Sequence, residues 1–135
     1  PVEDALGLIY GYAVGLDMTR RDLQGAAKSK GKPWDMGKGF DFSAPTGPLH
    51  KASDKGHPSE GIISLHVNGE LRQQGDLADM IWSVAETIAY LSSLVVLQPG
   101  DLIFTGTPEG VGPVVKGDKM IGHIDGFTDL EVTIT

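Results

Sequence analysis

The chain has 135 residues, of which 40% are hydrophobic and 21% are charged, so it has the length and composition of about one globular domain. Its 11 basic and 18 acidic residues give a formal net charge of -7, which argues against an extended phosphate-binding surface and therefore against a nucleic-acid-binding protein. The absence of cysteine excludes disulfides and cysteine nucleophiles and fits the cytoplasm, and the longest apolar run, 94–97, is far too short to cross a membrane.

The first predicted element is a strand over residues 8–17. Apolar residues alternate there, so one face carries Leu8, Tyr10, Tyr12, Val14 and Leu16, and the other carries Ile9, Gly11, Ala13, Gly15 and Asp17. The second face is almost bare, so backbone, a ligand or a metal ion can approach it closely. We expect the Asp17 carboxylate to stand at the end of this strand.

A short helix is predicted next, over residues 20–30. Thr19 followed by Asp22 resembles an N-cap with an acid in the first helical turn, and Gly31 is placed to end the helix. Arg21 and Gln24 are three residues apart and should share one face. Residues 34–48 are rich in glycine and proline, so we expect a loop or an irregular strand there.

A β-hairpin is predicted over residues 62–74. The dipeptide Asn68-Gly69 separates two strand-like runs and tolerates the positive φ angles of a type I′ turn. The clearest helix follows, because Ser83 and Glu86 form a capping-box pattern. Pro99-Gly100 should close it. Its apolar stripe at helical spacing consists of Val84, Ile88, Leu91 and Val95.

The last part of the chain is predicted to be β-structure. Residues 101–105 have the composition of a buried strand that runs into the glycine-rich turn 106–112. Two final strands are expected over 119–124 and 130–135, separated by Asp125-Gly126. The predicted fold class is therefore α+β, mostly β, with one main helix and short helices.

Several familiar catalytic motifs are absent. Residues 31–39 resemble a phosphate loop, but the spacing is one residue too long and Gly39 stands where Ser or Thr is required. There is no dinucleotide-binding glycine pattern, no G-x-S-x-G elbow and no H-E-x-x-H. The four histidines lack chelating spacing, so we interpret them as surface or packing residues.

Taken in order, several segments resemble the fumarylacetoacetate hydrolase family, in its acylpyruvase and fumarylpyruvate hydrolase branch. They are GLDMTRRDLQ at 15–24, a lysine twenty-one residues after Asp17, VNGELRQQG at 67–75 followed by DMI, and GDLIFTGTPEGVGP at 100–113. The resemblance implies a β-roll or sandwich with short helices and a divalent metal, usually Mg²⁺ with Mn²⁺ as an alternative. It also implies hydrolysis of a carbon-carbon bond in acylpyruvates such as fumarylpyruvate, as in the degradation of aromatic compounds, with release of pyruvate.

The resemblance also assigns roles to individual residues. Asp17 matches the metal-binding aspartate, while Arg21, Gln24 and Lys38 match catalytic and binding groups around the substrate carbonyls. Thr107 matches the threonine that meets the substrate carboxylate. From the residues alone, simpler interpretations stay open: Asp17 and Lys38 as turn residues, Arg21 in a local ion pair, Gln24 at the surface, and Thr107 as part of a Thr-Pro turn.

One departure from the family pattern is important. The resemblance implies two further metal-binding glutamates and a His/Glu pair that prepares the water, all of which would precede Pro1. We therefore expect residues 1–135 to be the C-terminal part of a larger catalytic domain, inactive when isolated. Members of the family are commonly homodimers, so a homodimer is expected here as well.

Two alternative functions remain. An isomerase or decarboxylase of related 2-keto or 2-hydroxydienoic acids, for example oxaloacetate, would use the same chemistry of chelation and enolate formation. A noncatalytic β module that binds a small anion would need none of it.

Overall fold

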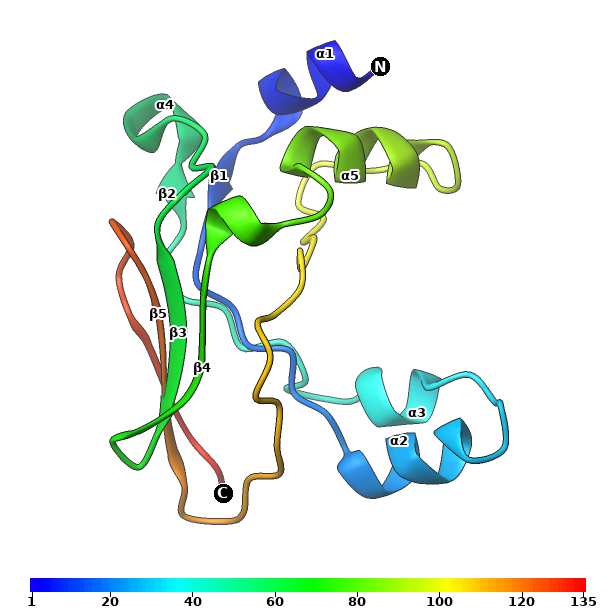
Figure 1. Ribbon diagram of the computed structural model, residues 1–135. Helices are drawn as coiled ribbons and strands as arrows, with labels where there is room; N and C mark the ends of the chain where they lie inside the picture. The colour runs from blue at the N-terminus through cyan, green and yellow to red at the C-terminus, as the bar shows by residue number, and fades with distance from the viewer.

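The computed structural model describes all 135 residues, arranged around one four-stranded antiparallel sheet. The strand order is β4-β3-β5-β6, and helices lie at both ends of the molecule (Figure 1). The strands of this sheet are β3 (Ile62–Val67), β4 (Glu70–Asp76), β5 (Lys119–Ile124) and β6 (Leu130–Thr133). A two-stranded ribbon is formed by β1 (Gly11–Tyr12) and β2 (His50–Lys51).

The helices are short. They are α1 (Val2–Ala5), η1 (Leu6–Leu8), α2 (Arg21–Lys28), α3 (Asp35–Lys38), α4 (Ala52–Lys55), η2 (Leu77–Asp79) and α5 (Val84–Ser92). Since α2 has 8 residues and α5 has 9, the prediction of a single main helix was wrong. The fold is mixed α/β with short helices and a four-stranded antiparallel sheet. This confirms that helices and strands are both present, but the helices together contain more residues than the strands, so the prediction of a mostly β fold was wrong. The β-roll or sandwich stays a prediction. No helix has both the length and the apolar character needed to span a membrane.

The predicted hairpin and the two predicted final strands are confirmed, and the final strands pair as a second hairpin. Asn68 has φ 53° and Gly69 has φ 82°, as a type I′ turn requires between β3 and β4. Strand β5 pairs with β3 and also with β6, which ends at Thr133, two residues before the predicted end. These hairpins form because their turn residues accept positive φ at little cost.

The predicted strand over 8–17 is only partly correct. Residues Leu6–Leu8 form a 3₁₀ turn, and the pairing partner β2 is only two residues long, so the ladder stops after Tyr12. The segment stays extended beyond it, with Leu16 N–H bonded to Pro45 O at 2.9 Å and Met18 N–H bonded to Ser43 O at 2.8 Å. The bare face is approached closely, as expected: a side chain at Gly15 would meet the Phe104 ring.

The two predicted helices need correction at their boundaries. Helix α2 begins at Arg21 with Arg20 as its N-cap, because the Thr19 hydroxyl accepts a hydrogen bond from Lys38 and does not cap the helix. Helix α3 falls within the predicted loop 34–48. Helix α5 has the predicted Ser83–Glu86 capping box, but it ends before Val95, which is exposed.

The predicted buried strand over 101–105 was wrong. Leu102 is 62% exposed, and residues 102–113 take part in no backbone–backbone hydrogen bond. An apolar run becomes a strand only where another strand pairs with it. In Figure 1 this segment, yellow to orange, runs as an irregular chain between the sheet and the α2–α3 pair.

The core is small. Leu16, Val67 and Met120 form its centre, and only 10 of the 135 residues are buried. The accessible surface is 9131 Å², whereas a compact monomer of this mass would expose roughly 6,800 Å². The molecule therefore presents much apolar surface to solvent, including Phe42, Ile81 and Val96.

Candidate functional site

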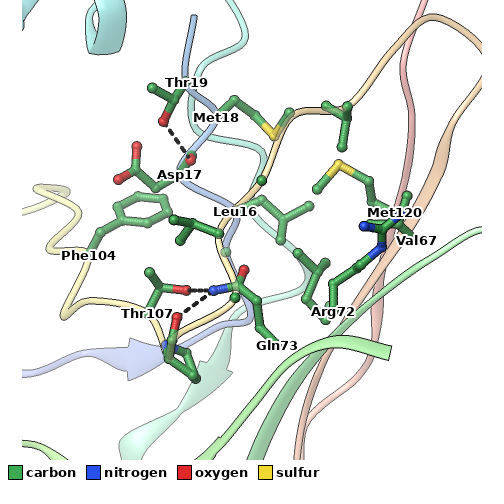
Figure 2. A pocket seen from close by; sticks show the side chains of 18 of the residues that line it. Leu16, Asp17, Met18, Thr19, Val67, Arg72, Gln73, Phe104, Thr107 and Met120 are labelled. Atoms are coloured by element: carbon green, nitrogen blue, oxygen red, sulfur yellow. Dashed lines mark hydrogen bonds between the residues drawn. The ribbon is translucent and has the colours of Figure 1, made fainter. Parts of the chain in front are cut away.

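One large cavity, of about 850 Å³, lies where residues 14–24, strands β3–β5 and the segment 104–114 meet. All the residues singled out from the sequence line it: Asp17, Arg21, Gln24, Lys38 and Thr107. They come from separate parts of the chain, and Figure 2 shows Asp17, Thr19 and Thr107 around the same space. The structure thus brings the predicted residues together, while their individual roles stay predictions.

Lys38 and Asp17 form an ion pair at the edge of the cavity. The Lys38 ammonium donates to Asp17 Oδ2 at 2.7 Å and to Thr19 Oγ1 at 2.9 Å. The Asp17 side chain is 53% exposed and that of Lys38 is 35% exposed, so both can reach a ligand. The pair joins residues twenty-one positions apart and sets one positive group beside one carboxylate.

The position of Lys38 depends on a close contact between α2 and α3. The carbonyl of Gly37 accepts a hydrogen bond from Arg20 N–H at 2.9 Å, and Gly37 is buried. A Cβ atom at Gly37 would lie 3.1 Å from the Gln24 backbone nitrogen. Glycine before Lys38 therefore permits a close approach of the two backbones.

Arg21 and Gln24 share a face of α2, as predicted. Arg21 Nη1 donates to Gln24 Oε1 at 3.0 Å in a partly buried position. This bond orients the Gln24 amide, so its NH₂ group is left to donate to a ligand, together with the remaining guanidinium hydrogens. The two side chains form a block of hydrogen-bond donors in the cavity wall.

Thr107 is held by a residue that sequence reasoning missed. Gln73, on β4, donates from its amide to Thr107 Oγ1 at 2.8 Å and to Pro108 O at 2.6 Å. Gln73 is 8% exposed and pairs across the hairpin with Leu65, which packs against the core. A glutamine on the apolar face of a strand needs a buried partner, and that was the available signal.

One histidine, His123, lines the cavity and has a defined pair of partners, while the interpretation of the histidines as surface or packing residues stays a prediction. His123 bonds Asp129 at 2.6 Å and Asp125 at 3.2 Å, and these bonds, with Asp129 first, raise its pKa above the ordinary value. The pKa of Asp125 is lowered, mainly by the Ile62 N–H that donates to it and then by His123. These hydrogen bonds join the end of β5 to the residues that follow it, and the three side chains form no group that could hold a metal ion.

The residues of this chain fit a divalent metal only in part. No group of three histidine, aspartate or glutamate side chains lies close enough to hold a metal ion. Mg²⁺ requires an octahedron of hard oxygen ligands, some of which are commonly water. Asp17 supplies one suitable and accessible carboxylate, so it can serve as one ligand among several.

The chain is similar to known proteins over its whole length. Residues 1–135 match the family model described as fumarylacetoacetate (FAA) hydrolase C-terminal. The chain is 48% identical over 132 residues to the fumarylpyruvate hydrolase of a Ralstonia species, which covers 98% of this chain and 68% of that protein. It superposes with a TM-score of 0.96 and 57% identity on the crystal structure of fumarylpyruvate hydrolase from Pseudomonas aeruginosa in complex with Mn²⁺ and pyruvate, covering 100% of this chain and 58% of that one.

Relatives with another activity are nearly as similar. The oxaloacetate tautomerase YcgM of Escherichia coli is 48% identical over 121 residues, covering 89% of this chain and 55% of that protein. The mitochondrial oxaloacetate tautomerase FAHD1 of Mus musculus is 42% identical over 137 residues, covering 99% of this chain and 61% of that protein. The chain thus spans between 55% and 68% of the length of these four proteins.

Proposed function

The chain belongs to the fumarylacetoacetate hydrolase family, and from this premise we propose that the full-length protein is a metal-dependent hydrolase of acylpyruvates such as fumarylpyruvate. The reaction would split the bond between the acyl carbonyl carbon and the methylene carbon of the substrate. Water supplies the hydroxyl group of the acyl acid, and the electron pair of the broken bond leaves with pyruvate as its enolate. A proton then converts the enolate to pyruvate.

One observation carries this proposal: an acid, an ammonium group and a block of donors converge on one cavity from distant parts of the chain. An acylpyruvate has the complementary chemistry, with a carboxylate, a 2-keto oxygen and an acyl carbonyl in a row. The relative whose structure holds Mn²⁺ and pyruvate supports the same substrate class.

A divalent metal, Mg²⁺ or Mn²⁺, would polarise the 2-keto oxygen and stabilise the developing negative charge when bound. Asp17 would be one of its ligands. Lys38, which donates to both Asp17 and Thr19, would lie beside that ligand.

The remaining residues would bind and orient the substrate. Thr107 would donate its hydroxyl hydrogen to the substrate carboxylate. Arg21, Gln24 and Lys38 would donate to the oxygen that becomes negative when water attacks the acyl carbonyl, a role in which preorganised donors are most effective. The Arg21–Gln24 hydrogen bond holds two of these donors in one orientation before the substrate binds.

A second function, isomerisation of a 2-keto acid, is supported by the oxaloacetate tautomerases that resemble the chain. The same donors stabilise an enolate whether it arises from bond cleavage or from removal of a proton. Decarboxylation would proceed through the same enolate. The choice depends on which bond breaks, and therefore on the substrate.

The test is to give the full-length protein and Mg²⁺ fumarylpyruvate, acetylpyruvate and oxaloacetate in parallel. Release of pyruvate together with the acyl acid supports the hydrolase. Keto–enol exchange of oxaloacetate without pyruvate indicates the tautomerase, and carbon dioxide without an acyl acid indicates the decarboxylase. A protein that binds pyruvate but converts none of the three would be a noncatalytic small-anion-binding module.

A further inference from the structure

The turn that carries Thr107 has no backbone hydrogen bonds of its own. Residues 102–113 neither donate to nor accept from another backbone group. A segment of this kind keeps one conformation only if side chains and packing hold it. The position of the Thr107 hydroxyl in the cavity must therefore be set from outside the turn.

Strand β4 supplies the surface on which the turn rests. A Cβ atom at Gly75 would lie 3.1 Å from Pro108 Cγ, so the proline ring packs directly on this glycine. Gly110 has φ +97° and approaches the Arg72 carbonyl so closely that no side chain would fit there. The turn is thus seated on β4 on both sides of Gln73.

Gln73 makes the only side-chain hydrogen bonds between this strand and the turn. Its Nε2 lies 2.8 Å from Thr107 Oγ1 and 2.6 Å from Pro108 O (Figure 2). The orientation of the amide follows from chemistry, because a carbonyl oxygen can only accept and the atom beside Pro108 O must be the nitrogen. Both amide hydrogens are then used inside the protein, so Gln73 has none left for a substrate.

This bond decides what the Thr107 hydroxyl can do. A threonine hydroxyl has one hydrogen to donate and two lone pairs that accept. Because Gln73 occupies a lone pair, the hydroxyl hydrogen points away from Gln73 and is available to an acceptor in the cavity. A carboxylate oxygen is such an acceptor, and a hydrogen bond to a charged group is about twice as strong as a neutral one.

We propose that Gln73 is a positioning residue that sets Thr107 as a hydrogen-bond donor toward the carboxylate of a 2-keto acid. The inference rests on the proposed function only for the contact between Thr107 and the carboxylate; it does not depend on which bond of the substrate breaks. Gln73 acts through Thr107 and touches no substrate atom itself.

The test measures pyruvate binding to the full-length protein by calorimetry in the presence of MnCl₂. Gln73→Met keeps the size of the side chain and removes its hydrogen bonds, and we expect roughly a tenfold weaker affinity. Gln73→Glu should weaken it further, because a carboxylate would accept the Thr107 hydrogen and repel Pro108 O. Gln74→Met is the matched control, since Gln74 is the adjacent, exposed glutamine of the same strand, and its affinity should change less than twofold.

A double-mutant cycle separates positioning from general support of the fold. Thr107→Val should weaken pyruvate binding, and adding Gln73→Met to it should have little further effect. Equal losses in both backgrounds would overturn the inference, as would unchanged binding in both Gln73→Met and Gln73→Glu. If Thr107→Val binds pyruvate normally, the proposed carboxylate contact fails, and the inference about Gln73 fails with it. If the variants change pyruvate binding as expected but the unaltered protein does not hydrolyse fumarylpyruvate, the hydrolase proposal fails while the inference about Gln73 stands.

Discussion

Asp17 is the residue of this chain that we propose as a ligand of the divalent metal. Its carboxylate is accessible, lines the cavity and is bonded to Lys38 at 2.7 Å. We expect Asp17→Ala in the full-length protein to lower Mg²⁺-dependent turnover at least about a hundredfold, because the proposed metal site loses one of its few ligands. Mn²⁺ binding measured by calorimetry should weaken in parallel, with an unchanged melting temperature.

The matched control for this variant is Asp41→Ala. Asp41 is exposed and does not line the cavity, so removing its carboxylate tests the effect of net charge alone. Turnover and Mn²⁺ binding should both stay near the original values. Activity that survives in Asp17→Ala would show that the metal-ligand role assigned to this residue is wrong.

At the scale of elements, the packing of α3 on α2 positions Lys38. Gly37→Ala would place a methyl group 3.1 Å from the Gln24 backbone nitrogen, so the two helices must separate by a few tenths of an ångström. We expect this variant to lower kcat and weaken pyruvate binding, because Lys38 and the Arg21–Gln24 pair shift relative to one another. The measurement is steady-state kinetics on the full-length protein together with thermal unfolding.

Gly25 provides the control for a glycine in the same helix pair. Nothing lies within 4 Å of a Cβ atom at this position, which is inside α2. Gly25→Ala should therefore keep full activity and stabilise the fold by about 0.5–1 kcal/mol through helix propensity. Equal activity of Gly25→Ala and Gly37→Ala would refute the importance of the α2–α3 contact.

The end of β5 should respond to pH through His123. The Asp129 and Asp125 hydrogen bonds raise the pKa of His123, so its stabilising effect is complete below about pH 6.5 and is lost as the pH rises through the raised pKa. The lowered pKa of Asp125 adds stability that is lost only as the pH falls below about 4. Between about pH 4 and the raised pKa of His123, the protonated imidazole and the Asp125 carboxylate are both charged.

Urea unfolding of the full-length protein at pH 5.5 and pH 8.5 would test this expectation. His123→Gln should remove the part of the stability that declines between the two pH values. His66→Gln is a suitable control, since His66 lies on the neighbouring strand β3 and forms no ion pair. If His123→Gln retains the original pH dependence, the ion pair does not contribute to folding in solution.

In the whole molecule, the core is small because many large apolar side chains are exposed to solvent. An accessible surface of 9131 Å², against roughly 6,800 Å² for a compact monomer, leaves little burial to offset the entropy of folding. We expect residues 1–135, expressed alone, to bind the dye ANS, to unfold without a sharp transition and to lack turnover. A sharp, cooperative unfolding transition without dye binding would show that residues 1–135 fold independently. The full-length protein is the reference for both measurements.

Local patterns in the sequence predicted the parts of the fold that local physics controls. Asn68-Gly69 specifies its turn because both residues accept positive φ, and Ser83 with Glu86 caps α5 through bonds that span only three residues. The Arg21–Gln24 pair is determined in the same way, by helical spacing. For such features the energy depends on neighbours in the chain, so the residue types are sufficient.

Tertiary structure alone decided the features that join distant segments. Residues 101–105 have the composition of a strand, but no strand pairs with them, and composition does not reveal a missing partner. The Lys38–Asp17 ion pair spans twenty-one residues, and the Gln73–Thr107 bond spans thirty-four. Those contacts exist because the packing of α3 on α2 and of the 106–112 turn on β4 brings the side chains within hydrogen-bonding distance, and no periodicity along the chain encodes that distance.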